Sequence, residues 1–293
     1  MEITRIAAHS FNNENDMHFS PEEYSQFKFG SKSIARIYGR ELAQKFISTP
    51  HYLDIVQDLK KNPEKRIIVM SSPFVHVPTA TWAMKDYFVR DINQALYKWG
   101  LSPVMETKIH RKSSYKEEYG EMSKEERLKV MTGDHFSVDG QLLTGNICLF
   151  LDDIVITGAH ETRICQMLEN YSLTNGQNYF LYFAHLLNSD TDPRIENFLN
   201  YNYVKDLIRL NKVIKNHEFQ MNTRVVKYIL DAKHDECKSF LLYQSDTFLH
   251  TLYHNAIGNQ YNLIEDYSIN FKLLEELVRN SDKVSNESLK LVK

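Results

Sequence analysis

Apolar residues recur along this chain in two patterns, short continuous runs and stripes at helical spacing. The continuous runs predict buried β-strands, because turn residues bound them on both sides; they are residues 66–70, 147–151 and 179–184. The stripes predict helices over residues 31–47, 52–60, 79–99 and 160–170, and helices throughout the chain beyond about residue 192. Residues 9–30 are polar and aromatic, and they predict a loop. Strand, helix and strand in this order predict a βαβ unit in a parallel sheet.

Turn-forming residues divide the chain into three predicted parts. Asn62-Pro63 interrupts the early helical pattern, and the polar run that ends at Pro193 separates the last predicted strand from the helical stripes. We therefore expect an N-terminal helical segment (residues 1–60), an α/β domain (residues 61–190) and a C-terminal helical region (residues 191–293).

Composition excludes several classes of protein. Hydrophobic residues make up 42% of the 293 residues and charged residues 25%, which suits a folded core with a solvated surface. The formal charge of -3 argues against a general nucleic-acid binder. Three cysteines without paired or metal-ligand spacing indicate a reducing compartment. There is no secretion-signal pattern and no apolar run of about 18 residues, so we expect a cytoplasmic protein without a membrane span.

Candidate chemistry is concentrated where the second predicted strand ends. Asp152 and Asp153 follow that strand directly, and Thr157 and Gly158 lie in the loop before the next predicted helix. Parallel α/β sheets bind ligands outside the carboxyl ends of their strands. Free amides at a helix N-terminus suit a phosphate, which glycine lets the backbone approach closely, and paired carboxylates suit a ribose diol or Mg²⁺. A capped turn without a ligand is the alternative.

The segment from Ile147 to Ala159 strongly resembles the binding motif for 5-phosphoribosyl diphosphate (PRPP) in type I phosphoribosyltransferases. The shared features are a hydrophobic strand, Asp-Asp, two apolar positions and Thr-Gly. Residues 89–95 and, more loosely, 111–136 resemble segments of the ComF-like branch, in particular the one found with bacterial tellurium-resistance and stress genes. The resemblance covers roughly residues 30–190. It implies a Rossmann-like α/β fold with a parallel sheet, to which N-terminal and C-terminal helical regions are added.

The resemblance also implies a role for each residue of the motif. Asp152 and Asp153 would bind the ribose hydroxyls of PRPP and, tentatively, Mg²⁺. A loop would bind the 5′-phosphate, and its residues are Ile156, Thr157, Gly158, Ala159 and His160. Two positions depart from the family pattern. Ile156 stands where the family has a hydroxyl or a catalytic carboxylate, and His160 stands where a further threonine is common, so no general base is identified.

The turn after the first predicted strand is the expected pyrophosphate site. By family analogy Ser71 and Ser72 would bind the pyrophosphate, with Pro73 and His76 nearby. Serine hydroxyls and turn amides are suitable donors to a polyanion. An ordinary strand-to-helix turn accounts for the same residues equally well.

A basic segment precedes the second predicted strand and resembles the flexible loop that closes over PRPP in the family. Its cationic residues are Lys108, Arg111 and Lys112. Residues 108–136 show little apolar periodicity, which predicts either an exposed hairpin or a mobile loop. A solvated hairpin of mixed charge is the alternative to a lid, because several glutamates follow directly.

These expectations combine into Mg²⁺-dependent transfer of a phosphoribosyl group from PRPP to an acceptor that the sequence does not identify. Ile156 and His160 support a different hypothesis, a regulatory protein of the same fold that senses PRPP or a nucleotide without turnover. A third hypothesis is an assembly protein whose C-terminal helices hold a partner. We expect no nucleic-acid or membrane partner, and a homo-oligomer is left open.

Overall fold

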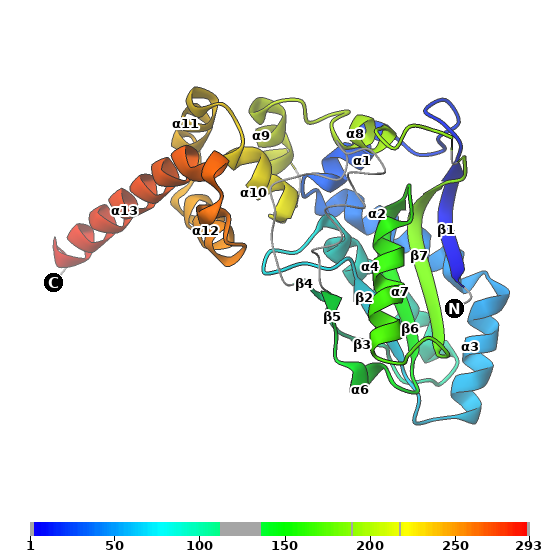
Figure 1. Cartoon of the computed structure of the whole chain (residues 1–293). Helices are drawn as coiled ribbons and strands as arrows, with labels where there is room; N and C mark the ends of the chain where they lie inside the picture. The colour runs from blue at the N-terminus through cyan, green and yellow to red at the C-terminus, as the bar shows by residue number, and fades with distance from the viewer. Residues whose placement is uncertain (1–2, 112–135, 189, 217, 292–293) are drawn as a thin grey trace.

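A five-stranded sheet in which all neighbouring strands are parallel organises the N-terminal two thirds of the chain (Figure 1). The computed structural model describes residues 3–111, 136–188, 190–216 and 218–291. The strand order is β1-β7-β6-β2-β3. The strands are β1 (Thr4–Phe11), β2 (Ile67–Ser71), β3 (Met105–Glu106), β6 (Ile147–Val155) and β7 (Gln177–Leu186).

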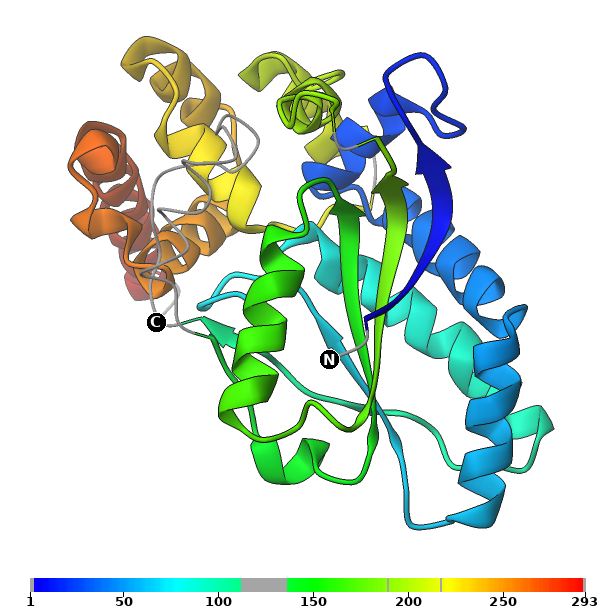
Figure 2. The same cartoon turned by 45° about the vertical axis from the view of Figure 1, so that its right-hand side comes forward.

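The central strands are apolar on both faces because helices cover both faces of the sheet (Figure 2). All five residues of β2 are buried, and so are eight of the nine residues of β6. One core lies between the sheet and a layer of helices that includes α2 (Lys32–Ile47), α3 (Pro50–Lys61) and α4 (Ala80–Lys98). The second core lies beneath α7 (Ala159–Asn170). This confirms the predicted Rossmann-like α/β fold.

The prediction of a loop over residues 9–30 was correct for residues 12–20 and wrong on either side of them. Strand β1 extends to Phe11 and pairs with β7, and helix α1 (Pro21–Lys28) follows. The Ser20 side chain caps α1 by accepting a hydrogen bond from the Glu23 amide at 3.3 Å, and proline occupies the first turn. The helix is too short to show a clear apolar stripe, so its signal lies in the cap and not in periodicity.

Strand β6 is longer than predicted. The apolar run ends at Leu151, but the strand continues to Val155, so Asp152 and Asp153 lie within the strand and not beyond its tip. Pairing with β7 holds this extension, with Asp152 opposite Tyr182 and Val155 opposite His185. The two aspartates are accommodated here because hydrogen-bond donors reach them, from Ser72 to Asp152 and from Tyr24 to Asp153.

The C-terminal helices surround a separate apolar cluster. They are α9 (Leu207–Asn216), α10 (Thr223–Leu230), α11 (His234–Leu242), α12 (Asp246–Gly258) and α13 (Ser268–Leu291), with two 3₁₀ turns, Tyr261–Leu263 and Glu265–Tyr267, before α13. Helix α8 (Ile195–Asn200) precedes them and packs Ile195 and Leu199 into the core beside the sheet. Figure 1 shows α11–α13 extending away from the sheet. The cluster also contains Phe29, which follows α1, and Val77, which lies between β2 and α4, so the C-terminal helices pack against the α/β part at two places.

Hydrogen bonds fasten these helices to the loop between β2 and α4. The Asn259 Oδ1 atom accepts from the amides of His76 at 3.0 Å and Val77 at 2.9 Å. The Thr223 amide donates to the Pro78 carbonyl at 2.9 Å. The C-terminal region therefore fixes the conformation of a loop at the carboxyl edge of the sheet.

Short elements complete the part of the chain that the structure describes. Strands β4 (His110–Arg111) and β5 (Phe136–Ser137) pair antiparallel, and α6 (Gly140–Leu143) leads into β6. The two strands flank residues 112–135, which lie outside the described residues, so the choice between a hairpin and a mobile loop for residues 108–136 stays a prediction. No helix within the described ranges is both long and apolar enough to cross a bilayer.

Helices α2 and α4 approach closely at Gly39, which gives a test of the packing. A Cβ atom at this position would lie 2.3 Å from the Met84 carbonyl oxygen, a backbone atom that cannot move aside. We expect Gly39→Ala to lower the free energy of unfolding by roughly 1–3 kcal/mol, as overpacked substitutions do. Urea denaturation measures this, with the exposed Gln44→Ala on the same helix as the control. Equal stability of the two variants would contradict the close packing.

Candidate functional site

The site lies where the direction of the sheet's connections reverses. From β2 the chain moves outward to β3, and from β6 it moves the opposite way through β7. Because β2 and β6 are neighbours, the loops that follow them diverge and leave a crevice at their carboxyl ends. This is the place at which open α/β sheets bind ligands.

A cavity of about 170 Å³ occupies this crevice. Its walls come from both parts of the chain. The α/β part contributes the end of β6 with the following loop, the start of α4 and the end of α1, and the helical region contributes α8 and α10. The polar and charged lining residues are Lys28, Ser72, Thr79, Thr81, Arg111, Asp152, Asp153, Thr157, His160, Glu161, Tyr182, Glu196, Thr223, Arg224 and Lys227.

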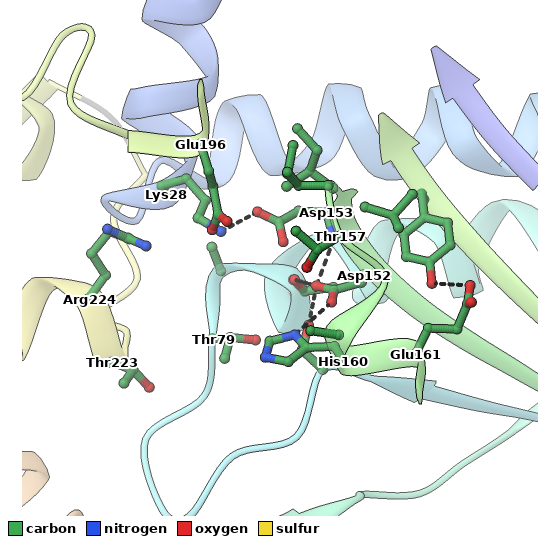
Figure 3. A pocket seen from close by; sticks show the side chains of 18 of the residues that line it. Lys28, Thr79, Asp152, Asp153, Thr157, His160, Glu161, Glu196, Thr223 and Arg224 are labelled. Atoms are coloured by element: carbon green, nitrogen blue, oxygen red, sulfur yellow. Dashed lines mark hydrogen bonds and ion pairs between the residues drawn. The ribbon is translucent and has the colours of Figure 1, made fainter. Parts of the chain in front are cut away.

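Asp152 faces the start of α4 and the loop that opens α7 (Figure 3). Its Oδ1 atom accepts hydrogen bonds from the Ser72 hydroxyl at 2.7 Å and from the Asp153 amide at 2.9 Å. Its Oδ2 atom lies 3.2 Å from Nδ1 of His160. Burial raises the pKa of Asp152, and the bond to His160 opposes that rise.

Asp153 points the opposite way, toward α1. Its Oδ2 atom accepts from the Tyr24 hydroxyl at 2.6 Å and forms an ion pair with the Lys28 ammonium. Burial alone would raise the pKa of Asp153, but the Lys28 charge and these hydrogen bonds outweigh it and lower the pKa. Burial and the Asp153 charge raise the pKa of Tyr24, so the hydroxyl keeps its proton and remains a donor.

Consecutive strand residues project to opposite faces of a sheet, and this explains the two environments. Asp152 meets neutral donors and a histidine, whereas Asp153 meets a lysine. The predicted pair therefore does not act as one bidentate unit. The structure brings both residues to the same cavity, but on different walls.

The loop after β6 opens helix α7 directly onto the cavity. Gly158 caps the helix with φ 70° and ψ 13°, a left-handed conformation that favours glycine. All five predicted loop residues line the cavity, namely Ile156, Thr157, Gly158, Ala159 and His160. The amides of the first turn point toward this space, which suits an anion.

A negative charge lies in the first turn of α7 and is neutralised from the edge strand. Glu161 is only 3% exposed, and the Arg5 guanidinium binds it with two hydrogen bonds of 2.6 and 2.7 Å. The Tyr182 hydroxyl donates a third at 2.9 Å. The hydrogen bonds that Arg5 donates to Glu161 raise the pKa of Arg5, so its charge persists. This neutralisation keeps the loop compatible with an anionic ligand.

A second helix N-terminus faces the same cavity. Helix α4 begins at Ala80, and Thr79, Ala80 and Thr81 all line the cavity wall. The Thr79 hydroxyl is buried and has no hydrogen-bond partner among the described residues, although threonine at this position commonly caps the helix. A buried hydroxyl without a partner is costly unless a ligand satisfies it.

The predicted pyrophosphate turn is only partly at the cavity. Ser72 lines the cavity, whereas Ser71 is the last residue of β2 and is not among the lining residues. The amides of His76 and Val77 already donate to Asn259, so this part of the turn is engaged with the C-terminal region. The neighbouring residues Thr79–Thr81 line the cavity at the N-terminal end of α4.

The residues of the predicted basic lid segment also lie in different places, and only some of them are at the cavity. Arg111 lines the cavity, but Lys108 donates to the Val75 carbonyl and lies 4.0 Å from the centre of the Phe74 ring. Desolvation lowers the pKa of Lys108. Lys112 lies outside the described residues. Of the described lid residues, Arg111 is therefore the one at the cavity.

Sequence reasoning missed the residues that come from distant elements. Lys28 and Tyr24 lie on α1, Glu196 on α8, and Thr223, Arg224 and Lys227 on α10. For α1 a signal was available, because Ser20-Pro21-Glu22-Glu23 has the form of a capping box. For α8 and α10 no local pattern distinguishes cavity residues from those of any polar helix face.

The ion pair between Arg5 and Glu161 gives a test of how the phosphate loop is supported. We expect Arg5→Met to lower the free energy of unfolding by about 1–2 kcal/mol, since Glu161 stays buried without its cation. The loss is below that of a fully buried pair because the Arg5 side chain is 41% exposed. Urea denaturation measures it, with Arg163→Met on α7 as the matched control, because the hydrogen bond of Arg163 to Gln166 is exposed to solvent. Equal stability of the two variants would contradict the role of Arg5.

Solved structures similar to this chain include hypoxanthine phosphoribosyltransferases of Trypanosoma cruzi. One, from work on the role of its C-terminal region in oligomeric state and enzymatic activity, is 16% identical, with 54% of this chain and 77% of that chain covered and a TM-score of 0.31. Another, in complex with the product IMP, is 16% identical, with 52% and 67% covered and a TM-score of 0.29. Superpositions at this level carry no argument about the present site. No curated protein matches the chain.

A family model gives the decisive comparison. The model described as PRTase ComF-like matches residues 3–274. The match extends beyond the roughly 160 residues in which the resemblance is visible by eye, and it includes β1 and most of the C-terminal helical region. It therefore confirms the resemblance carried by Asp152, Asp153, Thr157 and Gly158, and the chain belongs to the ComF-like phosphoribosyltransferase family.

Proposed function

We propose that this protein binds PRPP in the cavity at the carboxyl ends of β2 and β6 and transfers its phosphoribosyl group to an acceptor, with release of pyrophosphate. The observation that carries the proposal is the convergence of two helix N-termini on one cavity that also holds two carboxylates. PRPP has a phosphate group at each end and a ribose diol between them. The cavity offers a matching group for each part of this ligand. The two helix N-termini attract anions and would bind the phosphate ends, and the two carboxylates would accept hydrogen bonds from the ribose hydroxyls.

The loop 156–160 would bind the 5′-phosphate. Family membership supports this placement, and Gly158 supplies the left-handed turn that exposes the first amides of α7. Asp152 and Asp153 would accept hydrogen bonds from the two ribose hydroxyls. Tyr24 and Lys28 both bind Oδ2 of Asp153 and hold this carboxylate at the cavity wall.

The pyrophosphate would lie against the start of α4. Thr79–Thr81 and Ser72 surround this end of the cavity, and Arg111 adds positive charge. The unpartnered Thr79 hydroxyl is the donor with most to gain from a phosphate oxygen. In this placement Ser72 keeps its predicted role, whereas Ser71, which is not among the lining residues, has none.

The reaction breaks the bond between C1′ of the ribose and the pyrophosphate oxygen, and forms a bond between C1′ and the acceptor. Positive charge develops on the ribose ring as the pyrophosphate leaves, and pyrophosphate departs with both bonding electrons. The protein's contribution is to hold both phosphates and the ribose in position and to stabilise these charges. Asp152 and Asp153 lie beside the ring that becomes positive.

The predicted Mg²⁺ does not fit directly on these carboxylates. Asp153 already holds the Lys28 ammonium, and both oxygens of Asp152 have neighbouring donors, Ser72 and His160. Among the described residues there is no group of three or more His, Cys, Asp or Glu side chains that could hold a metal. We therefore assign no step to a metal ion bound by the protein.

A non-catalytic PRPP sensor is the second candidate, and Ile156 favours it. This side chain packs against the apolar core, at a position where the family often has a hydroxyl or a carboxylate. The chain therefore offers no base at that point of the loop. Pyrophosphate release with candidate nucleobase acceptors distinguishes the two functions, because a sensor binds PRPP without releasing pyrophosphate.

Thr79→Val tests the pyrophosphate end of the proposed site. Valine has nearly the shape of threonine and removes only a hydroxyl without a partner, so we expect the free energy of unfolding to change by less than about 0.5 kcal/mol. The loss of one bond to a charged phosphate should weaken PRPP binding by about 10- to 100-fold. Calorimetry with PRPP measures the affinity.

Thr251→Val on α12 is the matched control, because its hydroxyl donates to the Thr247 carbonyl in the helical region. It should leave PRPP affinity unchanged. Unchanged affinity in Thr79→Val would remove the pyrophosphate from the start of α4. Absence of PRPP binding to the wild-type protein would overturn the proposed function itself.

A further inference from the structure

The ion pair between Lys28 and Asp153 lies in the wall of the proposed PRPP site. Figure 3 shows Lys28 reaching across from α1 toward Asp153 on β6. Tyr24 lies four residues before Lys28, so both side chains lie on one face of the helix, and both bind Oδ2 of Asp153. A single helix face thus supplies a cation and a neutral donor to one carboxylate.

The surroundings hold Lys28 in this place. The Ser25 hydroxyl, on the same helix, donates to the Asn200 carbonyl at 2.7 Å and accepts from the Val204 amide at 3.1 Å. The Asn222 side chain donates to the carbonyl of Lys28 itself at 3.0 Å. Helix α1 is therefore hydrogen-bonded to the C-terminal region at Ser25 and at Lys28, and these bonds fix the position of Lys28.

The backbone after α1 allows little adjustment. Gly30 has φ 95°, and a Cβ atom there would lie 2.4 Å from the carbonyl oxygen of Gln220. The amide of Lys32 donates to the Glu218 carbonyl at 2.7 Å. These contacts bring the end of α1 against the segment before α10, so the position of Lys28 depends on the fold of both parts of the chain.

Burial makes the pair difficult to replace. Asp153 is 4% exposed, and the Lys28 side chain is 13% exposed. A divalent cation bound to Asp153 would have to expel the ammonium from this enclosed position and leave its charge without a partner, which is costly in a poorly solvated site. An ammonium also carries three N–H donors. The bond to Asp153 uses one of them, so a phosphate oxygen in the cavity can accept from another.

We propose that the Lys28 ammonium takes the place of the divalent cation at Asp153, so that this protein binds PRPP without Mg²⁺. The inference rests on the proposed function, because it concerns the same cavity and ligand. Lys28 would hold Asp153 in its ribose-binding orientation and donate to the phosphates of PRPP. Arg111, Arg224 and Lys227 line the same cavity and add positive charge around the ligand.

Calorimetric titration of PRPP into the full-length protein tests this, once with EDTA and once with Mg²⁺. We expect the two dissociation constants of the wild-type protein to agree within about threefold. Lys28→Met removes the charge at nearly constant length. Its affinity should fall by at least about tenfold in EDTA, and Mg²⁺ should restore most of that loss, because the carboxylate is then open to the metal.

Two further variants complete the experiment. Lys28→Arg keeps a cation at this position and should bind PRPP equally well with and without Mg²⁺. Lys45→Met is the matched control, since Lys45 is exposed on α2 and distant from the lining residues. It should behave as the wild type. Thermal unfolding followed by circular dichroism establishes that each variant is folded.

The outcomes separate the two proposals. Wild-type protein that binds PRPP only with Mg²⁺ would overturn the role of Lys28 and leave the proposed function standing. Equal loss of affinity in Lys28→Met with and without Mg²⁺ would also overturn it, because the lysine would then act only through the fold. No binding of PRPP in either condition would overturn the proposed function. If Lys28→Met does not fold, the wild-type comparison still decides.

Discussion

Two carboxylates on consecutive residues of a buried strand are the constraint around which this structure is organised. Each must find donors, because an unpaired charge away from water is unstable. Since the two side chains leave the strand on opposite faces, their partners come from different places. Asp152 is satisfied from the β2–α4 loop and from α7, and Asp153 is satisfied from α1. The resulting ring of donors defines the walls of the cavity.

The helical region beyond residue 190 belongs to the site and is not an appendage. It supplies Glu196 and three residues of α10 to the cavity, and its hydrogen bonds fix both α1 and the β2–α4 loop. The family match to residue 274 is consistent with this dependence. The carboxyl edge of the sheet forms one side of the cavity, and helices α8 and α10 enclose it from the other side.

The positive and negative charges of the cavity are paired across long distances in sequence. Arg5 neutralises Glu161 from the edge strand, and Lys28 neutralises Asp153 from α1. Two aspartates before the loop 156–160 and a glutamate after it would otherwise repel an anion. These pairings allow carboxylates to lie beside helix N-termini, which attract anions. The loop motif thus depends on residues that the motif itself does not contain.

Sequence alone determined the central strands, the long helices and the place in the chain of the loop that follows the two aspartates. Continuous apolar runs, helical stripes and the order Asp-Asp to Thr-Gly depend on local chain geometry, which neighbouring residues specify. It did not predict β1, because an edge strand is held by pairing with β7, 175 positions later for the pair Thr4 and Tyr179. Nor did it predict that Lys28 meets Asp153 or that Thr79, not Ser71, faces the cavity. Those relations join residues far apart in the chain or depend on a strand's exact end, and only the packing of the elements against one another decides them.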